Sequence, residues 1–152
     1  MASTKPDSLT APELNAWRGF LETHSRLIAE LDAELEREHG LPLTSYEVLL
    51  YLADAEGCSL RMGELADHLF LSRSGLTRLV DRLVKAGLVE RTTCESDRRG
   101  SYARLTELGR ERFDQARPTH LRGVRAHFLA RLDRSDLDRL CEIWARVLDR
   151  PE

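Results

Sequence analysis

The sequence predicts a mainly α-helical fold that carries one short β-hairpin. Along most of the chain, apolar residues recur at spacings of three and four, which is the periodicity of amphipathic helices. Around residue 95, two stretches rich in Val, Thr and Tyr flank a polar run, which is typical of a hairpin. The 152 residues, 41% of them hydrophobic, suffice for one domain or one subunit of a compact dimer.

Composition and motif content exclude several classes of protein. No apolar run approaches the roughly 20 residues of a membrane span. Residues 1–12 lack the apolar segment of a secretory signal, so we expect a disordered tail there and a cytoplasmic protein. Cys58, Cys94 and Cys141 are too far apart for a Cys-x-x-Cys zinc or dithiol site. The usual hydrolase, metalloprotease and phosphate-loop motifs are absent, so we expect neither catalysis nor a cofactor.

Charge is unevenly distributed along the chain. Residues 1–60 carry 4 Lys and Arg against 11 Asp and Glu, whereas residues 71–110 carry 9 against 5. A basic segment inside an acidic chain is expected when one surface meets phosphate and the remainder stays soluble.

The first predicted helix covers residues 13–40 and ends at Gly40 and Pro42. Its apolar residues follow a heptad pattern, with His24 in one slot. At 1.5 Å per residue the patterned part is roughly 35 Å long. A narrow apolar stripe of that length exceeds what a small domain covers, which predicts a dimerisation helix. The residues of the pattern are Leu14, Trp17, Leu21, His24, Ile28, Leu31 and Leu35.

Three shorter helices are predicted next. Thr44 and Glu47 form a capping-box pair for the first of them, which stops at Gly57. The second covers residues 62–69. Ser72 is the N-cap of the third, which stops at Gly87. Two short helices joined by a tight turn predict a helix-turn-helix.

The helix that follows Ser72 has one apolar and one polar face. Leu76, Leu79, Val80 and Leu83 are predicted to face inward. A small polar start followed by basic residues suits entry into a major groove, where short side chains approach bases and arginines reach guanine or phosphate. The alternative is an ordinary solvated helix. The candidate DNA-binding residues are Ser72, Arg73, Ser74, Thr77, Arg78 and Arg82.

Residues 88–94 and 101–105 are the predicted strands of the hairpin, and residues 95–100 are its predicted loop. The loop carries Arg98 and Arg99. The alternative for this feature alone is a polar turn without a partner. A basic hairpin beside a basic helix can contact neighbouring grooves of one duplex, so the two features together favour nucleic-acid binding.

Two further helices are predicted in residues 107–150. The first starts after Thr106 and continues to about Leu132, with a kink at Pro118. Ser135 and Asp138 are predicted to cap the second. Its apolar stripe consists of Leu137, Leu140, Trp144, Val147 and Leu148.

Several runs of residues combine into one pattern. They are Met62–Ala66, Leu71–Leu83 and Ala86–Arg91, followed by Asp97-Arg98-Arg99-Gly100 and then by Leu105, Thr106 and Gly109. This combination resembles the MarR family of winged helix-turn-helix transcriptional regulators. The resemblance covers nearly the whole chain.

The resemblance implies a homodimer that binds a pseudo-palindromic operator in duplex DNA. It implies a DNA-binding lobe in residues 43–106, with Arg99 as the wing arginine in the minor groove. Asp97 would hold an arginine by an ion pair, and Arg98 would contact phosphate. Residues 107–150 would form dimerisation helices with residues 13–40. The expected interface residues are Leu14, Leu21, Ile28, Leu137, Trp144 and Leu148.

The resemblance further implies a repressor that a small aromatic or phenolic effector releases from DNA. Trp17 and His24 are candidate ligand-binding residues, although plain interface packing is the alternative for Trp17. His24, His120 and His127 raise the possibility of metal or pH sensing, but no His-x-x-x-His pair supports zinc, so no metal site is predicted. The other alternative is a winged-helix module that docks proteins instead of DNA.

Overall fold

The computed structural model describes residues 8–94 and 97–149, and it describes residues 94 and 97–99 by their backbone alone. It contains two compact units. The central unit is Leu31–Leu121, and the terminal unit combines Met1–Glu30 with Arg122–Glu152. The predicted tail falls mostly outside the described residues, and the first helix begins at Ala11. Among the described residues, no helix is long and apolar enough to cross a membrane.

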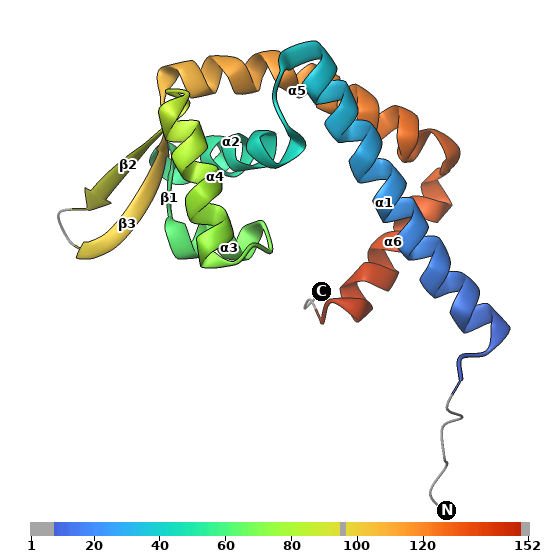
Figure 1. Ribbon diagram of the computed structural model, residues 1–152. Helices are drawn as coiled ribbons and strands as arrows, with labels where there is room; N and C mark the ends of the chain where they lie inside the picture. The colour runs from blue at the N-terminus through green and yellow to red at the C-terminus, as the bar shows by residue number, and fades with distance from the viewer. Residues whose placement is uncertain (1–7, 95–96, 150–152) are drawn as a thin grey trace, which may run out of the picture. The chain divides into compact units, whose positions relative to one another are not determined.

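The fold is mainly α-helical with one small sheet, as the sequence predicts (Figure 1). In chain order the elements are α1 Ala11–His39, α2 Leu43–Asp54, η1 Glu56–Cys58, β1 Ser59–Arg61, α3 Met62–His68, α4 Arg73–Lys85, β2 Val89–Cys94, β3 Asp97–Leu105, α5 Glu107–His127, η2 Leu129–Arg131 and α6 Arg134–Val147. All predicted helices are present. The helix after Thr106 ends at His127, earlier than predicted, and Pro118 lies within it.

The sheet has three antiparallel strands in the order β1-β3-β2. Strand β1 was not predicted, because three residues are too few to display an alternating pattern. It pairs with β3 through Ser59 opposite Arg104 and Arg61 opposite Tyr102. The strand therefore joins the hairpin to the start of α3, and the hairpin is held against the helix-turn-helix from both sides.

The predicted caps of α2 and α6 are both wrong. The N-cap of α2 is Pro42, which has no side-chain cap, so the Thr44 and Glu47 pair does not cap this helix. The free backbone N–H of Leu43 instead donates to Asp32 Oδ1 of α1 at 2.8 Å. A tertiary contact thus satisfies a donor that local sequence patterns assign to a neighbouring side chain.

The last helix begins slightly earlier than predicted. Its capping box is formed by Asp133 and Asp136, not by Ser135 and Asp138. Asp138 instead pairs with Arg134, 3.1 Å away in the first turn. Both pairs of residues have cap-like spacing, so the sequence offers two frames, and the one with two carboxylates is used.

The hydrophobic core lies in the central unit. Leu31 and Leu35 from the end of α1 are buried there together with the inner faces of α2, α3, α4 and β3. Tyr46 is buried, and its ring stacks on Phe113 at a centroid distance of 5.5 Å and is tilted against the His120 ring at 4.6 Å. Burial raises the pKa of Tyr46 to about 12 and lowers the pKa of His120.

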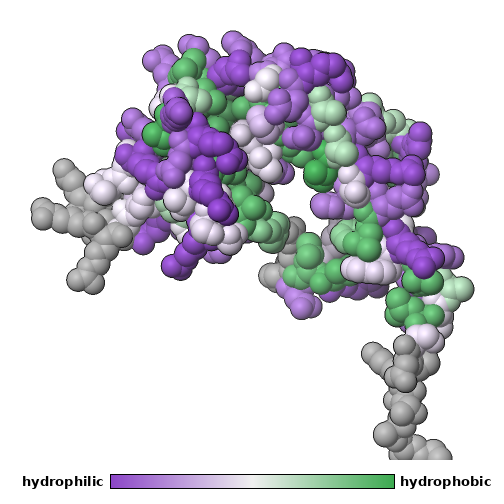
Figure 2. Space-filling model, in the orientation of Figure 1, coloured by the Kyte–Doolittle hydropathy of each residue, from purple (hydrophilic) through white to green (hydrophobic). Residues whose placement is uncertain are grey.

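The terminal unit lacks a core of this kind. None of its described hydrophobic side chains is buried, and α6 buries no residue at all. Figure 2 shows hydrophobic residues at the surface of the helices that Figure 1 labels α1 and α6. A pair of amphipathic helices with uncovered apolar faces is an incomplete packing unit.

Gly109 marks the closest approach of two elements in the central unit. Thr106 Oγ1 donates to the Gly87 carbonyl at 2.7 Å and accepts from the Gly109 N–H at 3.0 Å, which draws the start of α5 onto the segment after α4. A Cβ atom at Gly109 would overlap the Leu88 carbonyl oxygen and would lie 2.7 Å from Leu105 Cδ1. Only glycine fits this junction.

We therefore expect Gly109→Ala to lower the free energy of unfolding by about 1–3 kcal/mol or more, because a backbone carbonyl must move. Urea denaturation followed by circular dichroism measures this change. Gly63→Ala is the matched control, since a Cβ there meets nothing within 4 Å. Equal stability of the two variants would contradict the steric explanation.

Candidate DNA-binding surface

Helix α4 separates its side chains as the sequence predicts. Leu76, Leu79, Val80 and Leu83 are buried in the core. All six candidate DNA-binding residues of the segment are exposed on the opposite face, namely Ser72, Arg73, Ser74, Thr77, Arg78 and Arg82. The structure therefore gathers these side chains on one solvent-facing surface of the central unit.

The first turn of α4 is fixed by its own hydroxyl groups. Ser72 is the N-cap, and its Oγ accepts from the Gly75 N–H at 3.1 Å. The hydroxyls of Ser72 and Ser74 lie 3.3 Å apart. Thr77 Oγ1 donates to the Arg73 carbonyl at 2.8 Å, and its oxygen keeps the capacity to accept a hydrogen bond. This turn thus presents small hydrogen-bonding groups in fixed positions.

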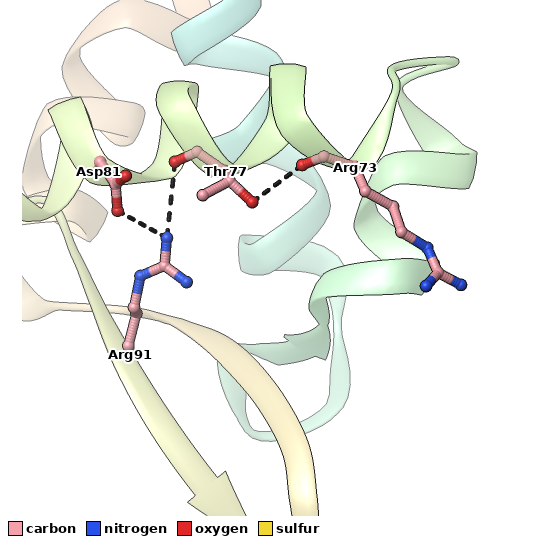
Figure 3. A network of polar contacts seen from close by, with 4 residues as sticks. All are labelled: Arg73, Thr77, Asp81 and Arg91. Atoms are coloured by element: carbon pink, nitrogen blue, oxygen red, sulfur yellow. Dashed lines mark hydrogen bonds and ion pairs between the residues drawn. The ribbon is translucent and has the colours of Figure 1, made fainter.

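An arginine from the hairpin connects β2 to the outer face of α4. Arg91 Nη2 lies 2.6 Å from Asp81 Oδ1 and donates to the Thr77 carbonyl at 3.5 Å (Figure 3). The Arg73 side chain points away from this network and into solvent (Figure 3). The role of Arg91 was not predicted, because its partner Asp81 is ten residues away on another element.

A basic hollow lies beside α4. It has a volume of about 570 Å³ and is lined by the starts of α3 and α4 and by residues of the hairpin. Arg61 stacks over the Tyr102 ring at 5.4 Å, and Arg73 and Arg91 line the hollow as well. Three arginines and one carboxylate, that of Glu64, line this concave surface, and Arg91 is paired with Asp81. The lining therefore carries an excess of positive charge, which favours an anionic polymer.

The hairpin departs from its predicted form in one respect. Strand β3 begins at Asp97, so residues 97–100 belong to the strand and not to a loop. The register changes between Thr93 and Cys94, and Arg98, Arg99 and Gly100 fall between two paired positions of β3. The pairing of β2 with β3 is therefore irregular at this end of the hairpin. The predicted side-chain roles of Asp97, Arg98 and Arg99 lie outside what the structure describes.

The two candidate ligand-binding residues, Trp17 and His24, lie on α1 in the terminal unit. Phe20 lies between them, with its ring centroid 6.2 Å from that of Trp17 and 6.4 Å from that of His24. The Trp144 ring of α6 is 5.7 Å from Phe20. The structure thus joins these residues in an aromatic cluster whose central member, Phe20, the sequence analysis missed because it lies outside the heptad positions.

His39, His68 and Cys58 each contact side chains of the central unit. His39 Nε2 is 2.8 Å from Thr119 Oγ1, and the His68 ring stacks on Tyr51 at 4.9 Å. Arg110 Nη2 lies 3.2 Å from Cys58 Sγ and also donates to a backbone carbonyl. Within residues 8–94 and 97–149, no group of three His, Cys, Asp or Glu side chains could hold a metal ion.

A helix-turn-helix with an exposed basic recognition helix, joined to a β-hairpin by an ion pair, defines a winged-helix DNA-binding protein. Comparison with known proteins agrees. The family model described as the MarR family matches residues 39–100. The chain belongs to the MarR family, whose members are DNA-binding transcriptional regulators and not enzymes.

Solved structures from Streptomyces coelicolor resemble the chain over nearly its whole length. AbsC, a MarR family transcriptional regulator, superposes with a TM-score of 0.89 and 38% identity, covering 93% of this chain and 95% of AbsC. Sco3205, of the same family and solved in complex with DNA, has a TM-score of 0.89 and 37% identity, covering 98% and 94%. The transcriptional repressor MprA of Escherichia coli K12 is 29% identical over 138 residues, which are 91% of this chain and 77% of MprA.

Proposed function

We propose that this regulator is a cytoplasmic homodimer that binds a pseudo-palindromic operator and represses transcription until a small aromatic or phenolic effector releases it. The observation that carries the proposal is the fixed polar and basic face of α4 above its fully buried face. The DNA complex of Sco3205, at 37% identity over most of both chains, supports the same use of this surface. MprA is described as a transcriptional repressor, which supports repression by this chain.

In this proposal, α4 enters the major groove. Ser74 and Thr77 lie near base edges, because their hydroxyls are short and are held at the start of the helix. Arg73, Arg78 and Arg82 contact guanine or phosphate. The Arg91 to Asp81 pair fixes the hairpin relative to α4, so that Arg99 enters the adjacent minor groove.

The terminal unit supports dimerisation. Leu21, Ile28, Trp144 and Leu148 are exposed, whereas Leu14 and Leu137 are half-buried. Apolar helix faces of this extent are covered in stable proteins, and a second copy offers the same faces for a symmetric interface. Two copies would then present two α4 helices to two half-sites of one operator.

The aromatic cluster supports the effector part of the proposal. Trp17, Phe20 and Trp144 expose ring surface, and His24 adds a hydrogen-bonding group at one end. A planar aromatic ligand with one polar substituent matches these groups. Binding there would stabilise one arrangement of the dimer helices and thereby change the spacing of the two α4 helices.

The DNA-binding prediction is tested by fluorescence anisotropy with the duplex upstream of the protein's own gene and with a scrambled duplex, at several salt concentrations. We expect at least roughly thousandfold preference for the operator. Arg99→Ala is expected to weaken binding by about 1–3 kcal/mol, because one ionic contact with DNA is lost. The slope of log affinity against log salt concentration is expected to fall by about one in magnitude.

Arg134→Ala is the matched control, since it removes an exposed arginine from the terminal unit. Equal binding of operator and scramble, followed by no enrichment in a selection from random duplexes, would favour a protein-docking module. An unchanged slope for Arg99→Ala would remove this residue from the DNA interface.

The dimer prediction is tested by Leu21→Asp. A carboxylate in an apolar interface is poorly solvated, so sedimentation velocity is expected to shift toward the monomer. Val84→Asp is the control, because Val84 is 38% exposed in the central unit and Leu21 is 45% exposed in the terminal unit. A dimer that tolerates Leu21→Asp would place the interface elsewhere.

The effector prediction uses the two tryptophans of the chain, which both belong to the cluster. Titration with hydroxybenzoates and cinnamates is expected to quench tryptophan fluorescence and to release operator DNA at the same ligand concentration. Trp17→Ala should raise the concentration required about tenfold, whereas Val147→Ala, at an exposed site outside the ring contacts, should not. Release of DNA by zinc or by acid alone would favour the metal or pH alternative.

A further inference from the structure

Phe70 is the most exposed large hydrophobic residue of the described chain, with 94% of its surface accessible. It lies in the turn between α3 and α4, two residues before the Ser72 cap. Its backbone has φ of +53°, which residues with a bulky side chain rarely adopt. Phe70 has no role among the residues predicted from the sequence or among the proposed contacts of α4.

A comparison of the C-terminal ends of α3 and α4 shows that the backbone conformation of Phe70 is unusual for its residue type. After α4, the Gly87 N–H donates to the Val84 carbonyl and the Leu88 N–H to the Leu83 carbonyl. After α3, the Phe70 N–H donates to the Asp67 carbonyl and the Leu71 N–H to the Ala66 carbonyl. Both patterns are the Schellman motif, whose left-handed position favours glycine. Gly87, with φ of +76°, fits this preference, and Phe70 does not.

Two independent costs therefore meet at one residue. The backbone strain of Phe70 lowers the stability of the turn. The exposed ring gains nothing from the core, although the leucines on both sides of it, Leu69 and Leu71, are each partly covered. A single exposed apolar residue is common, but the combination with left-handed backbone points to a contact made outside the chain.

We infer that Phe70 is a DNA-contacting residue whose ring packs on deoxyribose groups at the wall of the major groove that α4 enters. The inference rests on the proposed docking of α4. A helix with side chains is about 10–12 Å across and the groove is about 12 Å wide, so α4 fills the groove. The turn that precedes α4 must then lie over the sugar-phosphate strand that borders it.

The chemistry of that wall suits the ring. Deoxyribose exposes C–H groups between charged phosphates, and the neighbouring residues Ser72 and Arg73 are exposed to contact those phosphates. Packing of a neutral ring releases no counterion. Phe70 therefore contributes to affinity for duplex DNA without contributing to its salt dependence, in contrast to the arginines.

Phe70→Gly separates this role from folding. Glycine relieves the left-handed strain, so the melting temperature is expected to rise by a few degrees, while operator affinity falls about tenfold with the salt slope unchanged. Phe70→Leu, which keeps an apolar side chain, should retain most of the affinity. Cys58→Gly is the control, because Cys58 also has positive φ, at +55°, but lies outside the α3 to α4 turn. It should leave operator affinity unchanged.

Wild-type preference for operator over scramble is measured first, so a failure of the proposed function is seen before any variant is compared. Given that preference, unchanged affinity of Phe70→Gly would overturn the inference, as would a change of sedimentation, which would assign the ring to a second copy. Operators with deoxyuridine in place of thymine form the last arm. The difference between wild type and Phe70→Gly should persist there, and its disappearance would assign the ring to a thymine methyl group instead.

Discussion

The burial of one face of α4 is the constraint on which the remainder of the surface depends. Leu76, Leu79, Val80 and Leu83 are packed in the central core, so the helix cannot rotate about its axis without exposing them. At roughly 1.5–3 kcal/mol for each buried side chain, such a rotation would cost a large part of the stability of a small domain. The packing of the buried face therefore holds the polar residues of the opposite face outward, although those residues do not contribute to it.

The hairpin depends on the same helix. Arg91 bonds to Asp81 and to the Thr77 carbonyl, so the position of β2 follows the position of α4. Strand β1 ties the other side of the sheet to α3. An exposed ion pair contributes at most about 1 kcal/mol to stability. The main effect of the Arg91 to Asp81 pair is therefore to orient β2 relative to α4. The two elements that would contact neighbouring grooves are thus fixed relative to each other.

The sequence predicts the helices and their faces because a period of 3.6 residues survives any tertiary context. It predicts less well whatever depends on partners distant in sequence. The Asp32 contact that replaces the Thr44 cap, the partner of Arg91 and the place of Phe20 in the aromatic cluster all join residues from different turns or elements. The strand position of Arg98 and Arg99 was not predicted for another reason, because polar residues are typical of loops as well as of strand ends.

The left-handed turn at Phe70 was not predicted, because the residues that ordinarily indicate such a turn are missing. Residues 69–71 contain no Gly, Asn or Pro, so nothing local marks the left-handed turn that joins α3 to α4. The turn forms because Leu65 and Leu76 on either side of it are buried in one core, which leaves the chain too few residues for any wider connection. Core packing thus imposes the conformation, and the residue that adopts it is selected by what lies outside the chain. The same reasoning applies to the terminal unit, where a second copy in the proposed dimer would cover the apolar faces of α1 and α6 that the described residues leave exposed.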